Sequence, residues 1–223
     1  GGRAIALIYS PALERVFVDN GQASALLGWI WLVLSMAISL SLAALLIWRL
    51  IRRIEHLTRR DALTGTLNRR ALNEEMRQLQ ALRTRGHAHA IVLIDIDHFK
   101  HINDQLGHAA GDAALQHCVK VWRGVLREPD LLGRLGGEEF CALLPHTGLA
   151  EATVAAERMR MALQAQPLHW RGQPVAMTAS FGIAVGQPDD PLGEAGLALA
   201  DTEVYRAKAA GRNRVCVAQE AFS

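Results

Sequence analysis

The sequence predicts an α/β domain with a carboxylate site at the end of its sheet, preceded by a helix that spans a membrane. Three observations predict this organisation. The aliphatic run Ile91–Ile94 is typical of a strand buried on both faces, and Asp95 and Asp97 follow at its carboxyl end. The string Gly-Gly-Glu-Glu-Phe at 136–140 lies between two apolar runs, which indicates a β-hairpin. Residues 25–47 contain no charged side chain.

The N-terminal part is expected to cross a membrane once. Residues 1–22 are interpreted as the end of a truncated external segment, and residues 23–48 as the transmembrane helix, since about 20 apolar residues span a bilayer. Trp29, Trp31 and Trp48 fit interfacial aromatic belts. A signal peptide is disfavoured, because the apolar run is long and its basic flank follows it.

A basic cluster follows the apolar run and sets the expected topology. It consists of arginines, at Arg49, Arg52, Arg53, Arg59 and Arg60. The positive-inside rule places this side in the cytoplasm of a bacterial inner membrane. Topology explains the cluster more simply than nucleic-acid binding, and a net charge of +2 gives no nucleic-acid footprint.

Residues 49–60 are predicted to form a short helical stalk. Apolar residues recur at spacings of 3, 4 and 3, at Ile47, Leu50, Ile54 and Leu57. This heptad-like seam favours a parallel dimer, and a single amphipathic helix lying along the membrane or the domain is the alternative.

Residues 61–223 are assigned to the catalytic domain. Asp95 and Asp97 are two apart and so share one face of an extended chain, at the strand end where α/β folds bind ligands. With a hairpin glutamate, Asp95 would form an all-oxygen site suited to Mg²⁺ and a triphosphate. The alternatives are an ordinary polar hairpin and aspartates that cap the next helix, an alternative that suits Asp97 better than Asp95. The three cysteines have no metal-ligand spacing, which favours buried thiols in a reducing compartment.

Over residues 58–217 the chain resembles the GGDEF-domain diguanylate cyclases. Six motifs occur in the family's order: D-A-L-T-G-T-L-N-R-R from Asp61, D-I-D-H-F-K from Asp95 with Asn103-Asp104, G-H-x-x-G-D from Gly107, Arg134 with the GGEEF turn, T-A-S-F-G-I-A from Thr178, and A-D-x-x-x-Y-R-A-K-A-A-G-R-N from Ala200. The sequence departs from the family's pattern at Thr66, Leu135 and Glu203, and Leu135 replaces a common aromatic residue.

The resemblance implies a fold and a reaction. The fold is a ferredoxin-like α/β (α+β) domain with an antiparallel sheet, similar to the palm of nucleotide cyclases. The reaction joins two GTP into cyclic di-GMP and releases two pyrophosphates. It uses Mg²⁺ or Mn²⁺ and needs a homodimer, because each half-site holds one GTP.

The resemblance also implies roles for individual residues. Asp95, Glu138 and the main-chain carbonyl of Ile96 would bind the metal, with Glu138 and Glu139 as catalytic residues; a metal role and a base role for Glu138 stay open. The residues implied to bind the substrate are Phe99 and Lys100 at the phosphate turn, Asn103 and Asp112 at the guanine edge, and Lys208 and Arg212 at the terminal phosphates. Lys208 and Arg212 are four apart and are expected on one helix face, where the alternative role is solvation.

A second, inhibitory site is implied by Arg127 and Asp130, an R-x-x-D at the family's offset before Gly136, with Arg158 completing it from a neighbouring domain. Arginine binds phosphate bidentately and stacks on guanine. Two rival functions are less favoured. The intact carboxylates disfavour a non-enzymatic receptor for GTP or cyclic di-GMP, and the lack of a second catalytic domain in this sequence disfavours a phosphodiesterase. No P-loop motif is present.

Overall fold

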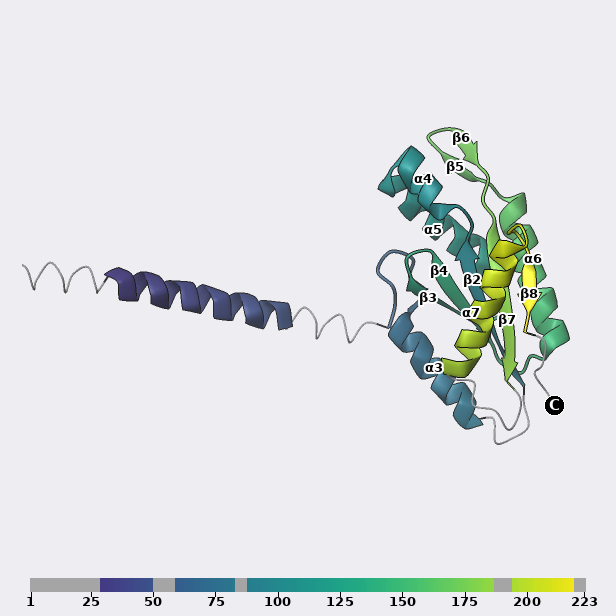
Figure 1. Ribbon diagram of the computed structural model, residues 1–223, viewed down its shortest axis with the longest axis horizontal. Helices are drawn as coiled ribbons and strands as arrows, with labels where there is room; N and C mark the ends of the chain where they lie inside the picture. The colour runs from purple at the N-terminus through teal and green to yellow at the C-terminus, as the bar shows by residue number, and fades with distance from the viewer. Residues whose placement is uncertain (1–28, 50–58, 83–87, 187–193, 219–223) are drawn as a thin grey trace, which may run out of the picture. The chain divides into compact units, whose positions relative to one another are not determined.

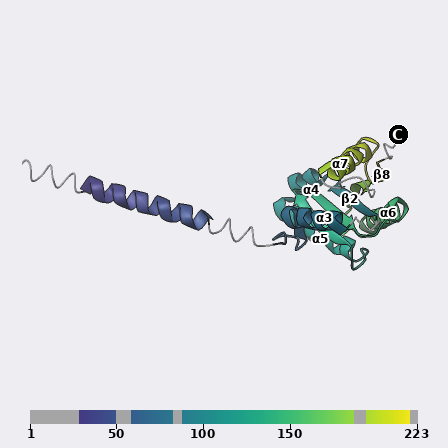
Figure 2. The ribbon, with the colours of Figure 1, turned by 90° about the horizontal axis from the view of Figure 1, so that it is seen from below.

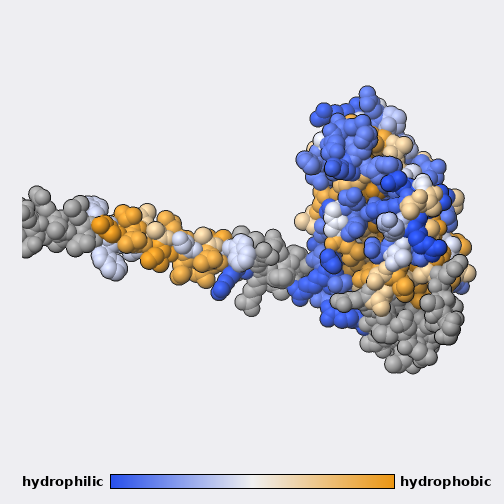
Figure 3. Space-filling model, in the orientation of Figure 1, coloured by the Kyte–Doolittle hydropathy of each residue, from blue (hydrophilic) through white to orange (hydrophobic). Residues whose placement is uncertain are grey.

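The computed structural model describes residues 29–49, 59–82, 88–186 and 194–218, in two units that divide between Thr58 and Arg59 (Figure 1). In the first unit, Trp29–Arg49 is a 21-residue helix with an 18-residue stretch of mean hydropathy 2.5, and none of that stretch is buried. Its surface is mostly hydrophobic (Figure 3). Its length and composition are sufficient to cross a membrane. The predicted external segment and most of the predicted stalk lie outside the described residues.

The second unit is an α/β domain. Its described elements are β1 (Leu67–Asn68), α3 (Arg69–Leu82), β2 (His89–Ile96), α4 (Phe99–Leu106), α5 (His108–Arg123), β3 (Leu131–Gly136), β4 (Glu139–Leu144), α6 (Leu149–Ala165), β5 (Leu168–Trp170), β6 (Gln173–Val175), β7 (Ala179–Gly186), α7 (Glu194–Ala209) and β8 (Val215–Val217).

The main sheet has the order β1-β3-β4-β2-β7-β8. Its four central strands are antiparallel and, with the intervening helices, follow the β-α-β-β-α-β order of the ferredoxin-like fold. The expected fold is therefore confirmed. The antiparallel expectation fails only at the edges, where β1 and β8 pair in parallel with their neighbours because each enters the sheet through a crossover connection.

Helices cover both faces of the sheet (Figures 1 and 2). On one face, α4, α5 and α6 pack over alternate β2 residues such as Val92 and Ile94, and the rings of Trp122, Phe140 and Phe181 meet edge to face there. On the other face, α3 and α7 pack over the residues in between. β2 is thus buried on both sides, as its aliphatic run predicted.

The contact between α7 and β7 depends on Gly182. A Cβ at this position would collide with the carbonyl oxygen of Ala200 and lie 2.6 Å from the amide nitrogen of Val204. Both are backbone atoms of α7, so a Cβ at Gly182 could not be accommodated by a change of side-chain rotamer. The lack of a side chain therefore lets α7 lie directly on the sheet, which fixes the position of its polar residues.

Candidate active site

The GGEEF string forms the predicted hairpin between β3 and β4. Gly136 pairs with Glu139, and Gly137 and Glu138 make the turn. Gly137 has a φ of 51°, in the left-handed region that favours glycine, and the space around it is open. Glu138 is partly buried and Glu139 is exposed. The turn therefore presents two adjacent carboxylates beside the end of β2.

Asp95 lies next to this turn in the central strand. It is only 6% exposed, it pairs in register with Glu139, and its Oδ2 lies 2.7 Å from the Nζ of Lys208 on α7. Burial raises the pKa of Asp95, and the charges of Asp97 and Asp201 raise it further, against the opposing effect of Lys208. Burial followed by the charge of Asp95 also raises the pKa of Glu138. The centre thus concentrates negative charge around the buried Asp95.

This donor set fits a divalent cation. Asp95 and Glu138 offer hard carboxylate oxygens, and they lie close enough together for the charge of Asp95 to raise the pKa of Glu138, in addition to the effect of burial. The amide of Ile96 donates to the carbonyl oxygen of Glu138 at 3.3 Å, which ties the turn to the end of β2. Among the described residues, no group of three or more His, Cys, Asp or Glu is arranged to hold a metal. Waters or ligand oxygens would therefore complete the coordination of a cation here.

Asp97 does not cap the following helix. His98, with a φ of 56°, occupies the cap position of α4 and makes no side-chain cap bond. Asp97 is instead buried and accepts hydrogen bonds from the hydroxyls of Thr178 and Ser180, both at 2.7 Å, and from the amide of Asn213 at 3.0 Å. It joins β2, β7 and the turn after α7, so its role is structural and the capping interpretation is wrong.

Lys208 and Arg212 do not share a helix face. α7 ends at Ala209, and Gly211, Arg212 and Asn213 all have positive φ values. The amide of Arg212 donates back to the carbonyl oxygen of Ala207 at 3.0 Å, which turns the chain toward β8. Spacing alone suggested a continuous helix, and the glycine-containing turn ends it. Arg212 is exposed in this turn.

The residues implied to read guanine lie on two packed helices. Asn103 is on α4 and Asp112 is on α5, next to Gly111. A Cβ at Gly111 would collide with Oδ1 of Asn103 and lie 3.2 Å from the ring of Phe99. The glycine thus gives the Asn103 amide its place beside Asp112. Phe99 and Lys100 begin α4, where backbone N–H groups are free to bind an anion.

Two residues that support the turn were quoted in motifs but given no role by the sequence. Arg134 donates to the carbonyl oxygen of Gly137 through Nε at 3.0 Å and Nη2 at 2.8 Å, and its Nη1 lies 3.2 Å from Oδ1 of Asp61. Burial would raise the pKa of Asp61, but hydrogen bonds from Thr64 and Arg134 outweigh burial and lower it. Asp61 and Arg134 are 73 positions apart in the chain, so the spacing within a motif does not reveal that they are in contact.

Arg127 and Asp130 are brought together at the turn before β3. The Arg127 Nη2 lies 3.2 Å from Oδ1 of the buried Asp130 and donates to the hydroxyl of Thr147 at 2.9 Å. Arg127 and Arg158 line one depression together with exposed residues of α6. A single domain therefore presents both arginines on one surface, and completion of the site by Arg158 of a neighbouring domain stays a prediction.

Comparisons with known proteins agree with this geometry. The family model for the diguanylate cyclase GGDEF domain matches residues 58–214. Diguanylate cyclase DgcP of Pseudomonas aeruginosa is 45% identical over 159 residues, 71% of this chain and 24% of that protein. Cyclic di-GMP phosphodiesterase NbdA of the same organism is 33% identical over 239 residues, 95% of this chain and 30% of that protein. The chain thus spans less than a third of either relative.

A solved structure gives the same result. The coiled coil and GGDEF domain of DgcB from Caulobacter crescentus, in complex with c-di-GMP, superimposes with a TM-score of 0.68 at 29% identity. The match covers 82% of this chain and all of that one.

Proposed function

Because this chain belongs to the GGDEF family of diguanylate cyclases, we propose that it joins two molecules of GTP into cyclic di-GMP and releases two pyrophosphates. The observation that carries the proposal is the pairing of Asp95 with the Glu138–Glu139 turn. An inactive family member could lose these carboxylates and keep its fold, but here they are present, on a turn whose main-chain carbonyl oxygens accept hydrogen bonds from Arg134 and from the amide of Ile96. A role limited to binding cyclic di-GMP, which has no triphosphate, would not need them.

The residues would divide the work of phosphoryl transfer. The 3′-oxygen of each GTP forms a bond to the α-phosphorus of the other, and the bond from that phosphorus to the bridging oxygen of pyrophosphate breaks. Asp95, Glu138 and the carbonyl oxygen of Ile96 would hold divalent metal, Mg²⁺ or Mn²⁺, which supplies charge neutralisation at the triphosphate. Glu138 or Glu139 would accept the proton of the attacking hydroxyl.

Substrate recognition would come from the helices around the centre. Asn103 and Asp112 would pair with the guanine edge, which disfavours adenine because its donors and acceptors are reversed. Phe99 and Lys100 at the start of α4 would bind phosphate oxygens, with Lys208 and Arg212 at the terminal phosphates. The Nζ of Lys208 already lies 2.7 Å from Oδ2 of Asp95, so a small shift of this flexible side chain would bring its charge to the phosphates of a nucleotide bound there.

We also propose that the chain acts as a membrane-anchored homodimer, with residues 61–223 in the cytoplasm. The apolar helix Trp29–Arg49 and the arginines after it support the anchor. The heptad-like seam and the coiled coil in the DgcB structure support a parallel stalk. One domain binds one GTP in this scheme, so two must meet to form both phosphodiester bonds. A stalk raises their effective concentration.

The purified chain, incubated with GTP and Mg²⁺ or Mn²⁺, is expected to form cyclic di-GMP and two equivalents of pyrophosphate. Chelation of the metal is expected to stop the reaction, because the paired carboxylates then face the triphosphate without a cation. Chromatographic separation of the nucleotides with a pyrophosphate assay measures both products. Linear pppGpG as the final product, or hydrolysis of added cyclic di-GMP, would contradict the proposed activity.

Product inhibition is expected at the depression that Arg127 and Arg158 line. Arg127→Ala should keep the initial rate near wild type while weakening inhibition by added cyclic di-GMP roughly tenfold or more, since it removes a bidentate phosphate ligand. Initial rates at increasing product concentration measure the effect. Arg171→Ala, at an exposed arginine over Trp170, is the control. Unchanged inhibition in Arg127→Ala would show that the product binds elsewhere.

A further inference from the structure

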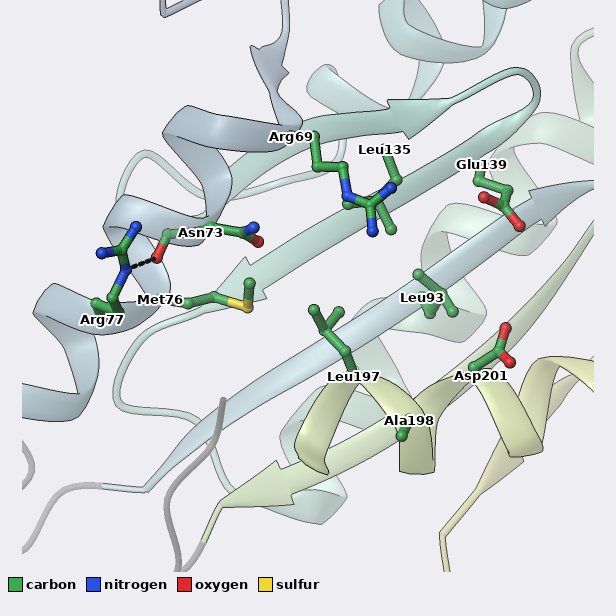
Figure 4. Close-up of a pocket in the computed structure, with 10 residues that line it drawn as sticks. All are labelled: Arg69, Asn73, Met76, Arg77, Leu93, Leu135, Glu139, Leu197, Ala198 and Asp201. Atoms are coloured by element: carbon green, nitrogen blue, oxygen red, sulfur yellow. Dashed lines mark hydrogen bonds between the residues drawn. The ribbon is translucent and has the colours of Figure 1, made fainter. Parts of the chain in front are cut away.

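A pocket of about 520 Å³ lies between α3 and α7 over the sheet (Figure 4). Its size is typical of sites that receive a ligand or a partner's side chain. The lining is mainly apolar in the middle, with Met76, Leu93, Leu135 and Leu197, and charged at the rim. Leu93, Glu139 and Asp201 also line the small cavity that holds Asp95 and Lys208, so the pocket adjoins the catalytic centre.

The pocket contains an acceptor with no hydrogen bond. Oδ1 of Asn73, on the α3 wall, is buried and has no hydrogen-bond partner within the described part of the chain. Figure 4 shows the Asn73 amide facing the space above Met76. A buried acceptor is costly without a donor, so an occupant with a hydroxyl or N–H group is favoured over a purely apolar one.

A large exposed side chain stands on the other side of the catalytic centre. Tyr205 on α7 is 73% exposed and borders the cavity that holds Asp95 and Lys208. Ala198, which lines the large pocket, precedes Tyr205 by seven residues, so both lie on one face of α7, about 10 Å apart. The protruding ring and the open pocket are therefore neighbours on one surface, with the catalytic centre beside them.

We propose that two copies of this chain pack these surfaces together, with Tyr205 of each copy entering the pocket between α3 and α7 of the other. This inference rests on the proposed function, and it names the surface through which the two half-sites meet. A two-fold interface is self-complementary, which requires a protrusion and a matching pocket on the same surface, on opposite sides of the axis. Tyr205 and the pocket satisfy that requirement.

The arrangement also accounts for the neighbouring chemistry. The two-fold axis would pass close to Asp201 on α7, so the two catalytic centres would face each other, as the joining of two GTP requires. The tyrosine hydroxyl would donate to Oδ1 of Asn73, which gives the buried acceptor its partner. Tyrosine at the centre of an interface typically contributes much of the binding energy.

Complementation between two variants tests this contact in the full chain. Tyr205→Ala removes the ring and keeps the pocket, whereas Ala198→Arg, at an exposed helix position, fills the pocket and keeps the ring. Each variant alone is expected to lose about tenfold in cyclic di-GMP formation at low protein concentration. A mixed dimer, purified through two different tags after co-expression, retains one of the two contacts and is expected to exceed both parents.

Controls separate the contact from other effects. Met161→Arg places the same charge on an exposed position of α6, on the opposite face of the sheet, and is expected to keep the wild-type rate. Tyr205→Phe keeps the ring but not the hydroxyl and should fall between wild type and Tyr205→Ala. A mixed dimer no more active than the mean of its parents would overturn the inference, provided that the wild type forms cyclic di-GMP.

Disulfide cross-linking between subunits detects the contact independently of catalytic activity. A chain that carries Tyr205→Cys and a second chain that carries Ala198→Cys are expected to form a disulfide between subunits on oxidation, through the two introduced thiols. Within one helix the two positions are about 10 Å apart, beyond the reach of a disulfide. Tyr205→Cys paired with Met161→Cys is the control and should give no covalent dimer. A failure of the first pair to cross-link would overturn the inference even if the wild type proved to have another activity.

Discussion

Glu138→Gln is expected to lower the rate of cyclic di-GMP formation by roughly 10³-fold or more, because it removes a negative oxygen from the centre where metal and triphosphate would meet. The substitution keeps the size of the side chain and the main-chain bond from the Ile96 amide, so the turn should keep its shape. Initial rates at saturating GTP and metal measure the loss. GTP binding in the absence of metal should change little.

The control for this prediction is Glu128→Gln. Glu128 is an exposed glutamate in the loop before β3, and its neutralisation should leave the initial rate unchanged. A Glu138→Gln enzyme with turnover near wild type would show that this carboxylate neither binds metal nor accepts a proton. The catalytic assignment of the GGEEF turn would then have to be abandoned.

Gly182→Ala is expected to lower the free energy of unfolding by roughly 3 kcal/mol, at the upper end of the cost of overpacking a core. The new methyl group would meet backbone atoms of Ala200 and Val204, and backbone cannot give way as a side chain can. α7 would have to lift from β7 and carry Lys208 away from Asp95. Urea denaturation followed by circular dichroism measures the stability.

Gly124→Ala is the matched control for the glycine at the sheet. Gly124 follows α5 with an ordinary helical φ of −69°, and a Cβ there comes no closer than 3.3 Å to another atom. Its replacement should change stability by less than about 1 kcal/mol, as a compatible Gly→Ala site. If Gly182→Ala were equally harmless, the close approach of α7 to β7 would not be what fixes the position of Lys208.

The sequence was sufficient where the signal is local. The aliphatic run before Asp95 and the glycines of the turn predicted a buried strand and a hairpin, and both exist because burial pattern and turn chemistry act over a few residues. The ferredoxin-like fold followed from the order of motifs. Asp95, Lys208 and the GGEEF turn lie together at one end of the sheet, and the roles of the site residues stay predictions.

The sequence was insufficient where the determinant is a contact between distant segments. Nothing in the spacing of Asp61 and Arg134 indicates that they meet. Capping was an open alternative for Asp97 because its partners Thr178 and Ser180 lie 81 and 83 positions further along the chain. The spacing of Lys208 and Arg212 likewise predicted one continuous helix, but α7 ends at Ala209. Three successive residues after it have positive φ values, and this turn is set by the path of the chain toward β8.

The ion pair between Lys208 and Asp95 has a consequence for how the site is loaded. The Lys208 ammonium group gives the buried Asp95 carboxylate an opposite charge, at 2.7 Å between Nζ and Oδ2. If the chain binds a metal–nucleotide complex as proposed, Asp95 would help to hold the divalent ion, and Lys208 would then be available to bind the phosphates. On this proposal, substrate entry would be an exchange of counterions at Asp95, in which the buried carboxylate keeps a positive neighbour before and after the exchange.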